Sequence, residues 1–479
     1  MTADRHTVAV VLAAGRGSRF GGGKLLATLD GRPVLQHVLD RLDAAGMERV
    51  VVVLGDDAIE IEPAIEWRDE RRVRNADPGR GLSSSLRVGI DALDDDVTSV
   101  LIVLGDQPRV PVDAIRAVAT ARMDPDRPIV VPRYADDPAP NPVLIRRGAF
   151  RLLDEVRGDR GLGPVIEANP ERVQVVPIAA AAGADNPDVD TRDDLVNLLE
   201  MAWTDRVLAN KDQVDRFREV PDATDFYAPV TSLFRADPTR TDEPALASLL
   251  ALVRPGDTWL DIGAGAGRYA LPIARAVSSS GGGVIALDPS AGMLAGLREI
   301  AAEHGISNVR TVEARWPPED GDVTPYAADV SLIAHVSYDI APIGPFVAAM
   351  ESAARRLCVA VLMERQPSSI ADVCWPPVWG ETRIALPALP EFVELLRARG
   401  RRPSIEHLER APRRFGSRDE LEAFLRRQLW VDRGSAADRR FLEALEPLLV
   451  TDDDGRVGLR DQRPLPIGIV RWDPGAGHV

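Results

Sequence analysis

The sequence predicts an α/β protein built of two domains, and this prediction depends on three observations. Residues 8–12 form a short continuous apolar run, typical of a strand buried on both faces, and a glycine-rich loop connects this run to Lys24. A second unit of strand and glycine-rich loop begins at Thr258. The chain has 479 residues, a length that usually forms two or three domains. We therefore expect one glycine-loop domain in each half of the chain.

Composition and charge limit the classes of protein and partner. Apolar residues make up 45% of the chain and charged residues 28%, which is typical of globular proteins in solution. The net charge of −16 disfavours a nucleic-acid-binding surface, and no apolar run is long enough to span a membrane. The two cysteines, Cys358 and Cys374, are too few for a disulfide framework or a zinc motif. We expect a cytoplasmic protein whose partners are small molecules.

The loop after the first apolar run has the composition of a phosphate-binding loop. Residues 8–24 read VAVVLAAGRGSRFGGGK, with glycines at positions 15, 17, 21, 22 and 23. A strand, a glycine-rich basic loop and a following helix place backbone N–H groups around a phosphate. Leu25 after Lys24 excludes the P-loop pattern, and the glycine spacing differs from the dinucleotide fingerprint. A glycine-rich turn without a ligand is the alternative.

Lysine is rare in this chain, which draws attention to Lys24. Two of the 58 basic residues are lysines, Lys24 and Lys211, which leaves 56 arginines. A compact ammonium group differs from a planar guanidinium in the contacts it makes. We therefore expect that Lys24 is selected for its ammonium group.

Further elements follow in the first half. Residues 34–45 are predicted to form a helix, and residues 49–55 and 100–104 two more buried strands. Ser83, Ser84 and Ser85 open another helix, where a serine hydroxyl either caps a free N–H group or contacts a sugar or base. Capping alone explains one of the three serines.

Two acidic positions are candidate metal ligands. Asp106 follows strand 100–104, and open α/β sheets bind ligands at the carboxyl ends of their central strands. Asp190 precedes a helix predicted over residues 191–201. Both carboxylates could converge on one Mg²⁺ ion that holds a triphosphate. For Asp190, capping of the helix N-terminus is the alternative.

Together these segments resemble the molybdenum cofactor cytidylyltransferase family, whose members are MobA-like NTP transferases. The resemblance covers residues 6–202 and is carried by LAAGRGSRFGGGK, GLSSSL, LGDQP, NPVLIRR, GDRGLGPVI and DVDT. Members join CMP from CTP to molybdopterin and release pyrophosphate, so the resemblance implies CTP or another NTP, and Mg²⁺. Related guanylyltransferases usually carry a glycine pair where this chain has Ala13 and Ala14.

The resemblance implies roles for individual residues of the first half. Lys24, Arg19 and Asp106 would be catalytic, and Asp106 and Asp190 would bind the metal. The residues that would contact the nucleotide are Leu12, Ala13, Ala14, Gly15, Lys24, Ser83, Ser84 and Ser85. The implied mechanism is in-line attack of an acceptor phosphate on the α-phosphorus, which needs positioning and charge neutralisation and no general base.

The second half contains its own glycine-rich loop. Residues 258–268 read TWLDIGAGAGR, and Asp288 ends the next predicted strand. An acidic residue at that spacing accepts hydrogen bonds from ribose hydroxyls. DIGAGAG and ALDPS, however, resemble the class I S-adenosylmethionine-dependent methyltransferases more closely than NAD enzymes, over residues 245–475. The remaining strands of that family's seven-stranded sheet are expected at residues 308–313, 329–334, 359–363, 403–411 and 466–473.

The second resemblance implies a cofactor site and an acceptor side. The residues that would bind S-adenosylmethionine are Asp261, Gly263, Gly265, Gly267, Asp288, Ala314 and Arg315. His335 and Tyr338, just past the fourth strand, would lie on the methyl-acceptor side, with a structural role as the alternative for His335. Trp375, Trp379 and Trp430 would form an apolar substrate wall or, in the favoured interpretation, pack in the core.

These inferences combine into one architecture of two Rossmann-like domains. We expect an N-terminal nucleotidyltransferase α/β domain over residues 1–205, a linker and lid over residues 206–245, and a seven-stranded class I methyltransferase domain over residues 246–479. The expected function is transfer of NMP, with CMP from CTP as the first choice, to a phosphorylated acceptor such as molybdopterin. It is combined with methyl transfer from S-adenosylmethionine to an unknown acceptor.

Two alternative functions stay open, and a protein partner is implied. The first alternative is a methyltransferase with a non-catalytic nucleotide-sensing module. The second is nucleotidyl transfer to a sugar phosphate or another phosphorylated metabolite. The first resemblance also implies a molybdoenzyme that receives the cofactor.

Overall fold

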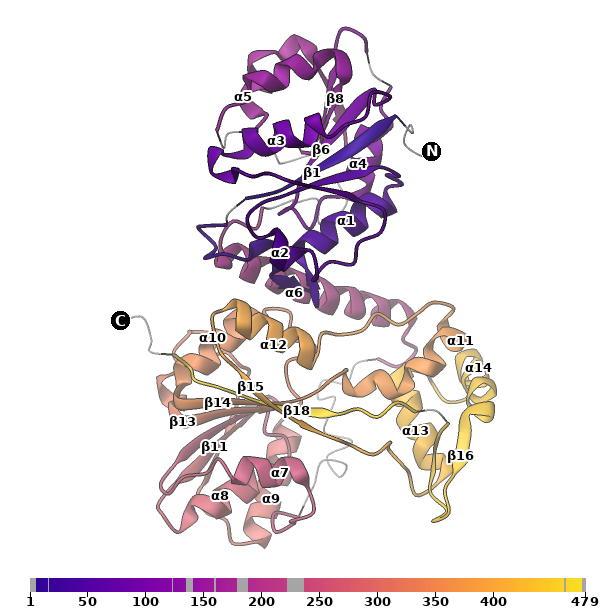
Figure 1. The fold of residues 1–479 in the computed structure, drawn as a ribbon. Helices are drawn as coiled ribbons and strands as arrows, with labels where there is room; N and C mark the ends of the chain where they lie inside the picture. Colours follow the sequence, from indigo (N-terminus) through magenta and orange to yellow (C-terminus); the bar gives the residue numbers. More distant parts are fainter. Residues whose placement is uncertain are drawn as a thin grey trace. The chain divides into compact units, whose positions relative to one another are not determined.

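The computed structural model describes residues 6–15, 17–122, 124–134, 141–158, 161–178, 188–221, 237–460 and 462–475. The chain forms two compact units, Met1–Leu198 and Leu199–Val479, and each has a central sheet with flanking helices (Figure 1). The boundary between the units falls inside α6 (Arg192–Phe217). The sequence analysis ended the predicted helix at residue 201 and placed a linker from residue 206, whereas α6 continues to Phe217, because neither Gly nor Pro interrupts it. None of the helices in the described part of the chain is long and apolar enough to cross a membrane.

The sheet of the first unit has seven strands in the order β5-β4-β1-β6-β8-β7-β9. Only β8 runs antiparallel to its neighbours. Every residue of β1 is buried, as expected for a strand that is covered on both faces. The strands of this unit are β1 (Thr7–Ala13), β2 (Thr28–Leu29), β3 (Arg32–Pro33), β4 (Val50–Leu54), β5 (Arg71–Arg74), β6 (Ser99–Leu104), β7 (Ile129–Arg133), β8 (Val143–Arg146) and β9 (Val173–Pro177).

Helices cover both faces of this sheet. Ala9 and Val11 of β1 face α1 and α4, whereas Val8 and Val10 face α3 and α5, because successive strand residues point to opposite faces. The helices of this unit are α1 (Val34–Ala44), α2 (Ala58–Ile61), α3 (Leu82–Asp91), α4 (Val112–Ala119), α5 (Gly163–Ala168) and the start of α6, with 3-10 segments at Lys24–Leu26, Pro78–Arg80, Arg147–Glu155 and Pro170–Arg172.

The glycine-rich loop does not lead directly into an α-helix, and in this the sequence expectation was wrong. Lys24–Leu26 forms a single 3-10 turn, and β2 and β3 intervene before α1. Gly21, Gly22 and Gly23 have φ angles of 93°, 95° and 67°, which other residues rarely adopt. The N–H groups of Gly21 and Gly22 both donate to Gly17 O (3.1 Å each). The loop is therefore closed by its own backbone bonds.

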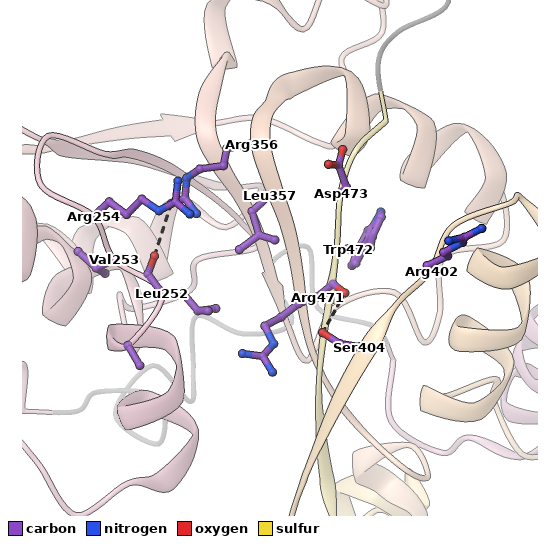
Figure 2. A pocket seen from close by; sticks show the side chains of 11 residues that line it. Leu252, Val253, Arg254, Arg356, Leu357, Arg402, Ser404, Arg471, Trp472 and Asp473 are labelled. Atoms are coloured by element: carbon purple, nitrogen blue, oxygen red, sulfur yellow. Dashed lines mark hydrogen bonds between the residues drawn. The ribbon is translucent and has the colours of Figure 1, made fainter.

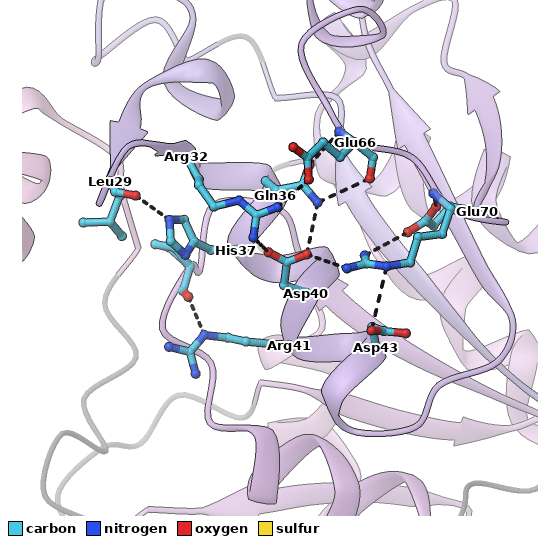
Figure 3. A network of polar contacts seen from close by, with 11 residues as sticks. Leu29, Arg32, Gln36, His37, Asp40, Arg41, Asp43, Glu66 and Glu70 are labelled. Carbon is cyan, nitrogen blue, oxygen red and sulfur yellow. Dashed lines mark hydrogen bonds and ion pairs between the residues drawn. The ribbon is translucent and has the colours of Figure 1, made fainter. Parts of the chain in front are cut away.

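A polar network fixes the segment after α2 to α1 (Figure 3). Asp40 accepts hydrogen bonds from Arg32 Nη1 (2.5 Å), Gln36 Nε2 (3.1 Å) and Arg68 Nη2 (2.9 Å). Glu66 N donates to Gln36 Oε1 (2.7 Å). Burial alone would raise the pKa of Asp40, but Arg68, Gln36 and Arg32 outweigh it and lower the pKa below its usual range. This carboxylate therefore stabilises the first unit in its ionised form.

The sheet of the second unit has seven strands in the order β12-β11-β10-β13-β14-β18-β15. β18 runs antiparallel to both of its neighbours, β14 and β15, and the other neighbouring pairs are parallel. The seven strands confirm the sheet that the resemblance implied. The strands are β10 (Thr258–Ile262), β11 (Gly283–Asp288), β12 (Val309–Glu313), β13 (Ala328–Ala334), β14 (Ala354–Met363), β15 (Ser404–Leu408), β16 (Leu449–Thr451), β17 (Val457–Leu459) and β18 (Ile467–Trp472).

Helices cover this sheet as well. Leu249 of α7, Leu271 of α8 and Leu297 of α9 share one core with the sheet. On the other face Phe392 of α12 packs edge-on against Trp472, with ring centroids 5.8 Å apart. The helices are α7 (Pro244–Leu250), α8 (Ala270–Ser278), α9 (Ala291–Glu303), α10 (Ile343–Ala353), α11 (Trp375–Trp379), α12 (Leu389–Ala398), α13 (Arg418–Leu429) and α14 (Ala436–Leu445), with 3-10 segments at Thr324–Tyr326, Pro367–Cys374 and Glu446–Leu448.

A smaller core lies beside this sheet, where α11, α13 and α14 meet. Trp375 is 1% exposed, and Phe217 at the end of α6 contacts both Trp375 and Trp379, with ring centroids 6.3 and 5.4 Å apart. Trp430, at the end of α13, packs against the same cluster. Trp375 is therefore part of this core, as the favoured interpretation expected, and Trp379 and Trp430 are partly buried against it.

Candidate functional site

The first candidate site lies where the strand order reverses between β1 and β6. The two strands are parallel neighbours, with Leu12 opposite Leu104. Gly105 N donates to Leu12 O (2.9 Å), and a Cβ atom at Gly105 would lie 3.0 Å from Ala13 Cβ. Glycine at position 105 therefore lets the two strand ends approach each other. Open α/β sheets bind ligands at this kind of position.

Lys24 lies between two carboxylates of this site. Its Nζ donates to Asp106 Oδ2 and to Asp190 Oδ1 (3.3 Å). A Cβ atom at Gly17 would lie 3.3 Å from Lys24 Cγ, so the glycine leaves room for the lysine stem. Burial alone would lower the pKa of the Lys24 ammonium, but Asp106 and Asp190 outweigh it and raise the pKa. Lys24 is therefore charged at neutral pH.

Asp190 contacts this site and does not cap α6. Its two carboxylate oxygens accept hydrogen bonds from Lys24 Nζ (3.3 Å) and Arg19 Nη1 (3.2 Å). Thr191 and Asp194 form the cap, because Asp194 N donates to Thr191 Oγ1 (3.2 Å) and Thr191 N donates to Asp194 Oδ2 (2.7 Å). The structure thus brings Lys24, Arg19, Asp106 and Asp190 together, and their catalytic and metal-binding roles stay predictions.

Asp188 and Gln107 belong to the same site, although the sequence analysis assigned them no role. Gln107 Nε2 donates to Asp188 Oδ1 (2.7 Å), and Val189 N donates to Asp106 O (3.0 Å). Burial and the neighbouring carboxylates raise the pKa of Asp188 to about 6. The available signal was their position in the LGDQP and DVDT motifs, where Gln107 directly follows Asp106 and Asp188 lies two residues before Asp190.

The predicted nucleotide-binding residues fall into two groups, one at the end of β1 and one at the start of α3. Leu12, Ala13 and Ala14 are buried, so they offer a ligand only backbone groups, whereas Gly15 is exposed. In the second group, Gly81 holds the N-cap position of α3 and none of the serines caps the helix.

Asn75 organises the serines of the second group. Asn75 Nδ2 donates to Ser84 Oγ (2.8 Å) and Ser85 Oγ (3.0 Å). Ser83 N donates to Gly158 O (3.0 Å), so the start of α3 is also tied to that turn. The sequence analysis had selected the serines and missed Asn75, which lies outside every motif that carried the resemblance.

The carboxylates of this site fit Mg²⁺ by their chemistry. Asp106 and Asp190 both direct an oxygen at one cationic centre, the Lys24 ammonium. No cluster of three or more His, Cys, Asp and Glu side chains suited to a metal exists among the described residues. Mg²⁺ commonly takes one or two carboxylates and completes its shell with water and phosphate oxygens. The pair therefore matches a cation that arrives with a phosphate ligand.

The second candidate site occupies the corresponding position in the second unit, where the strand order reverses between β10 and β13. Gly263, Gly265 and Gly267 have φ angles of 74°, 55° and 83°. A Cβ atom at Gly263 would lie 2.5 Å from Val336 Cγ2, so the loop after β10 closely approaches the segment after β13. A Cβ atom at Gly265 would meet nothing within 4 Å, so the space beside this glycine is open.

Two buried aspartates organise this loop. Asp288 Oδ2 accepts a hydrogen bond from Gly265 N (2.8 Å), and Asp288 Oδ1 accepts one from Ser290 N (2.8 Å). Asp261 is 2% exposed, and its Oδ1 has no hydrogen-bond partner in the described part of the chain. Burial and the nearby Asp288 carboxylate raise the pKa of Asp261 to about 7. An unpartnered buried carboxylate oxygen beside an open loop fits a ligand that carries a hydrogen-bond donor or a positive charge.

The segment after β12 reaches the same edge of the sheet. Ala314 N donates to Asp288 O (3.3 Å), and the neighbouring Arg315 is exposed. The structure therefore places Ala314 beside Asp288, and the predicted contact of Ala314 and Arg315 with the cofactor stays a prediction.

His335 and Tyr338 follow β13 at this edge. His335 and Ser337 have φ angles of 58° and 101°, and such strained non-glycine residues gather at functional sites. Burial, together with Arg410 and Arg268, lowers the pKa of His335 to about 4, so the imidazole is neutral at pH 7. Its Nδ1 finds no partner among the described residues. Tyr338 Oη accepts a hydrogen bond from Met363 N (2.7 Å), which ties this residue to the end of β14.

Other polar residues near these loops carried no sequence signal. After β14, Gln366 and Ser369 are 1% and 7% exposed, and Gln366 Nε2 and Ser369 Oγ have no partners within the described ranges. Glu243 accepts hydrogen bonds from Tyr269 Oη and Arg240 Nε (2.7 Å each) and pairs with Arg268 Nη2 (3.0 Å). Glu243 thereby fixes the residues that follow the glycine loop.

Curated relatives match a short part of the chain. The bifunctional protein GlmU of Paracidovorax citrulli is 37% identical over 118 residues, which are 23% of this chain and 24% of that protein. GlmU of Mycobacterium avium is 36% identical over 123 residues, which are 24% of this chain and 25% of that protein. The chain therefore spans about a quarter of the length of these relatives.

Solved structures are also similar to parts of the chain. Rv0371c from Mycobacterium tuberculosis is 30% identical, with 42% of this chain and 98% of that chain covered and a TM-score of 0.36. Precorrin-6y C5,15-methyltransferase from Geobacter metallireducens is 15% identical, with 50% of this chain and 92% of that chain covered and a TM-score of 0.29.

Two family models match the sequence, one in each half. Residues 9–173 match the model of the MobA-like NTP transferase domain, and residues 260–357 match a methyltransferase domain. Each match includes the glycine-rich loop of its half and the strands beside it. The chain therefore joins a MobA-like NTP transferase domain to a methyltransferase domain.

Proposed function

We propose that the first unit transfers CMP from CTP to a phosphorylated acceptor, molybdopterin, and releases pyrophosphate. The observation that supports this most strongly is the Lys24 ammonium, held by Asp106 and Asp190 at the carboxyl edge of the sheet. An ammonium between two carboxylates contributes little to the stability of the fold at this partly open edge. The same arrangement is suited to bind a triphosphate that arrives with a divalent cation.

Lys24 and Arg19 would bind the triphosphate. Asp106 and Asp190 engage two of the three N–H donors of Lys24 Nζ, and the third is directed in this proposal to a phosphate oxygen. Arg19 is 77% exposed, so its guanidinium is free to move from Asp190 onto the β- and γ-phosphates. An oxygen of the acceptor phosphate attacks the α-phosphorus, and the bond between the α-phosphorus and the oxygen that bridges it to the β-phosphate breaks, which releases pyrophosphate. Lys24 and Arg19 neutralise the negative charge that develops on the phosphate oxygens during this step.

Asp106 and Asp190 would hold Mg²⁺, which supplies further neutralisation of the triphosphate when bound. Asp188, whose pKa of about 6 keeps part of the population protonated near neutral pH, would add negative charge as the pH rises. The backbone of residues 12–15 and the hydroxyls of residues 83–85, ordered by Asn75, would contact the nucleoside.

For the second unit we propose methyl transfer from S-adenosylmethionine. That compound supplies an activated methyl group when bound. The open space beside Gly265 and the unpartnered Asp261 Oδ1 support a site for its amino-acid end, and Asp288 would accept hydrogen bonds from the ribose. Ala314 and Arg315 would border the adenine, and the neutral His335 would hydrogen-bond the methyl acceptor, with Tyr338 shaping that side.

A titration of the full-length protein tests the proposal. CTP, GTP, ATP and UTP are titrated separately by calorimetry, with and without Mg²⁺, and pyrophosphate release is then assayed with molybdopterin as acceptor. We expect CTP to bind most tightly, to lose affinity without Mg²⁺, and to yield pyrophosphate only when the acceptor is present.

Each other outcome replaces the proposal with a defined alternative. A preference for GTP would assign guanylyl transfer. Binding of CTP with pyrophosphate release only on a sugar phosphate would change the acceptor, and binding without release on either acceptor would indicate a nucleotide-sensing module. No binding of any NTP would leave methyl transfer as the only activity. We also propose that this protein is cytoplasmic and that it passes its product to a molybdoenzyme.

A further inference from the structure

A depression of about 440 Å³ lies in the second unit, beside the start of β14 and the end of β18 (Figure 2). Val330 of β13 is opposite Leu357, and Trp472 of β18 is opposite Cys358, so the depression borders the first residues of β14. The glycine loop of this unit follows the last residues of β10, which is parallel to β13 and β14. The depression is therefore at the opposite edge of the sheet from the methyltransferase site.

Apolar and basic side chains make up most of the lining of this depression. Leu252, Val253 and Leu357 provide an apolar part of the wall. Four arginines line it as well, and Figure 2 shows Arg254 and Arg356 on one side, Arg402 on the other, and Arg471 between them. A concave surface of this size with an apolar wall and a few polar groups is typical of small-molecule sites.

The arginines outnumber the carboxylates that face them. Asp473 is the one carboxylate among the lining residues, and Asp257, which is not part of the lining, pairs through its Oδ2 with Arg356 Nη2 (2.5 Å). Four guanidinium groups against two carboxylates leave a net charge of about +2 in a chain whose net charge is −16. The Nε atoms of Arg356 and Arg471 are buried and have no partner among the described residues. These buried donors lack the acceptor that such groups normally have.

We propose that this depression binds a small phosphorylated metabolite. A phosphate monoester carries a charge of about −1.5 to −2 at neutral pH, which matches the local excess of positive charge. The guanidinium group presents paired donors that fit phosphate oxygens, and Arg356 and Arg471 supply such donors without full partners. The organic part of the metabolite packs against Leu252, Val253 and Leu357. The site is independent of the function proposed for either glycine loop.

Calorimetry on the full-length protein with phenyl phosphate as the probe tests this proposal. Arg471→Gln removes a central guanidinium, and Arg254→Gln removes an exposed one, whose loss leaves the core intact. Arg397→Gln, an exposed position outside the depression, is the matched control. We expect the dissociation constant to rise tenfold or more in Arg471→Gln, to rise less in Arg254→Gln, and to stay unchanged in the control.

Further arms separate this site from the first unit and from general anion binding. Lys24→Ala should leave phenyl phosphate binding intact. Loss of phenyl phosphate binding in Lys24→Ala, together with full binding in Arg471→Gln, would overturn the proposal. Inorganic phosphate should bind more weakly than phenyl phosphate because it lacks the apolar part. Equal binding of sulfate, benzoate and phenyl phosphate would reduce the depression to a general anion patch and contradict the proposal. If Arg471→Gln does not fold, unchanged binding in Arg254→Gln is the contradicting result.

Discussion

The two glycine-loop sites occupy equivalent positions in their sheets but differ in electrostatics. In the first unit, charged side chains contact one another across the site, and exposure rises from Lys24 (10%) to Arg19 (77%). In the second unit, Asp261 is 2% exposed, and His335 is kept neutral by burial. A site that handles a triphosphate needs mobile, solvated counter-charges, whereas a site for an organic cation needs a sheltered pocket with fixed acceptors. One topology therefore supports two chemistries through the residues that end its strands.

The largest expected effect changes the site of the first unit and leaves the site of the second unit intact. Lys24→Ala should lower pyrophosphate release by about 10²–10³-fold, because in the proposed function it removes the charge that would bind the triphosphate, and it should leave S-adenosylmethionine binding unchanged. Lys211→Ala removes the other lysine of the chain, which is exposed on α6, and should change neither activity. Pyrophosphate release at the parental rate in Lys24→Ala would contradict the site assignment.

The second prediction changes the site of the second unit and leaves the site of the first unit intact. Asp288→Ala should weaken S-adenosylmethionine binding by about 10–100-fold, because a buried carboxylate that orders Gly265 and would meet the ribose is lost. CTP binding should be unaffected, and calorimetry with each ligand measures both effects. Asp320→Ala, at an exposed position of the same unit, is the control. A simultaneous loss of CTP binding would show that the two sites are not independent.

The third prediction concerns the pH dependence of the buried aspartate. The folded-state pKa of Asp261, about 7, lies above its ordinary value of 3.8, so unfolded chains ionise first as the pH rises. The free energy of unfolding should therefore fall between about pH 4 and pH 7 through this group. Asp261→Asn should remove this pH dependence. At pH 8 its free energy of unfolding should exceed that of the parent by on the order of 1–3 kcal/mol, while its affinity for the cofactor should fall.

Tryptophan fluorescence during urea unfolding at several pH values measures this effect. Trp67 is the one tryptophan of the first unit, and the other seven lie in the second, so the signal mainly reports the second unit. A stability that follows the same pH curve in Asp261→Asn as in the parent would show that Asp261 is not the group responsible.

The smallest expected effect lies outside both sites. Asp40→Ala should destabilise the first unit by about 1 kcal/mol at pH 7, because Arg32 and Arg68 lose their shared carboxylate. The folded-state pKa of Asp40 is lowered, so its contribution is present above the ordinary carboxyl pKa and is lost as the pH falls through the folded value. Hydrogen exchange of the α1 amides measures the change. Asp43→Ala, which removes an exposed carboxylate from the same helix, should have little effect, and an equal loss would contradict the network.

Much of the fold followed from local patterns. The apolar runs at residues 8–12 and 100–104 became β1 and β6, because strands covered on both faces read as nearly continuous apolar runs. The strand expected before Gly263 became β10, which also contains the buried Asp261. The 3-10 turn at Lys24 was missed because the sequence pattern predicted that an α-helix follows the loop, whereas Lys24–Leu26 forms one 3-10 turn directly after three glycines with positive φ. The continuity of α6 was missed because a change in composition suggested a boundary that the helix itself does not have.

The sequence by itself determined the two sheets, their glycine-rich loops and the residue types at the strand ends. The tertiary structure decided which of those residues meet. Lys24 contacts Asp106 and Asp190, which are 82 and 166 positions away in the sequence. Asp190 contacts the candidate site and does not cap α6, because Thr191 and Asp194 form that cap. Local propensity acts over a few residues, whereas such contacts depend on where the whole sheet brings its strand ends together.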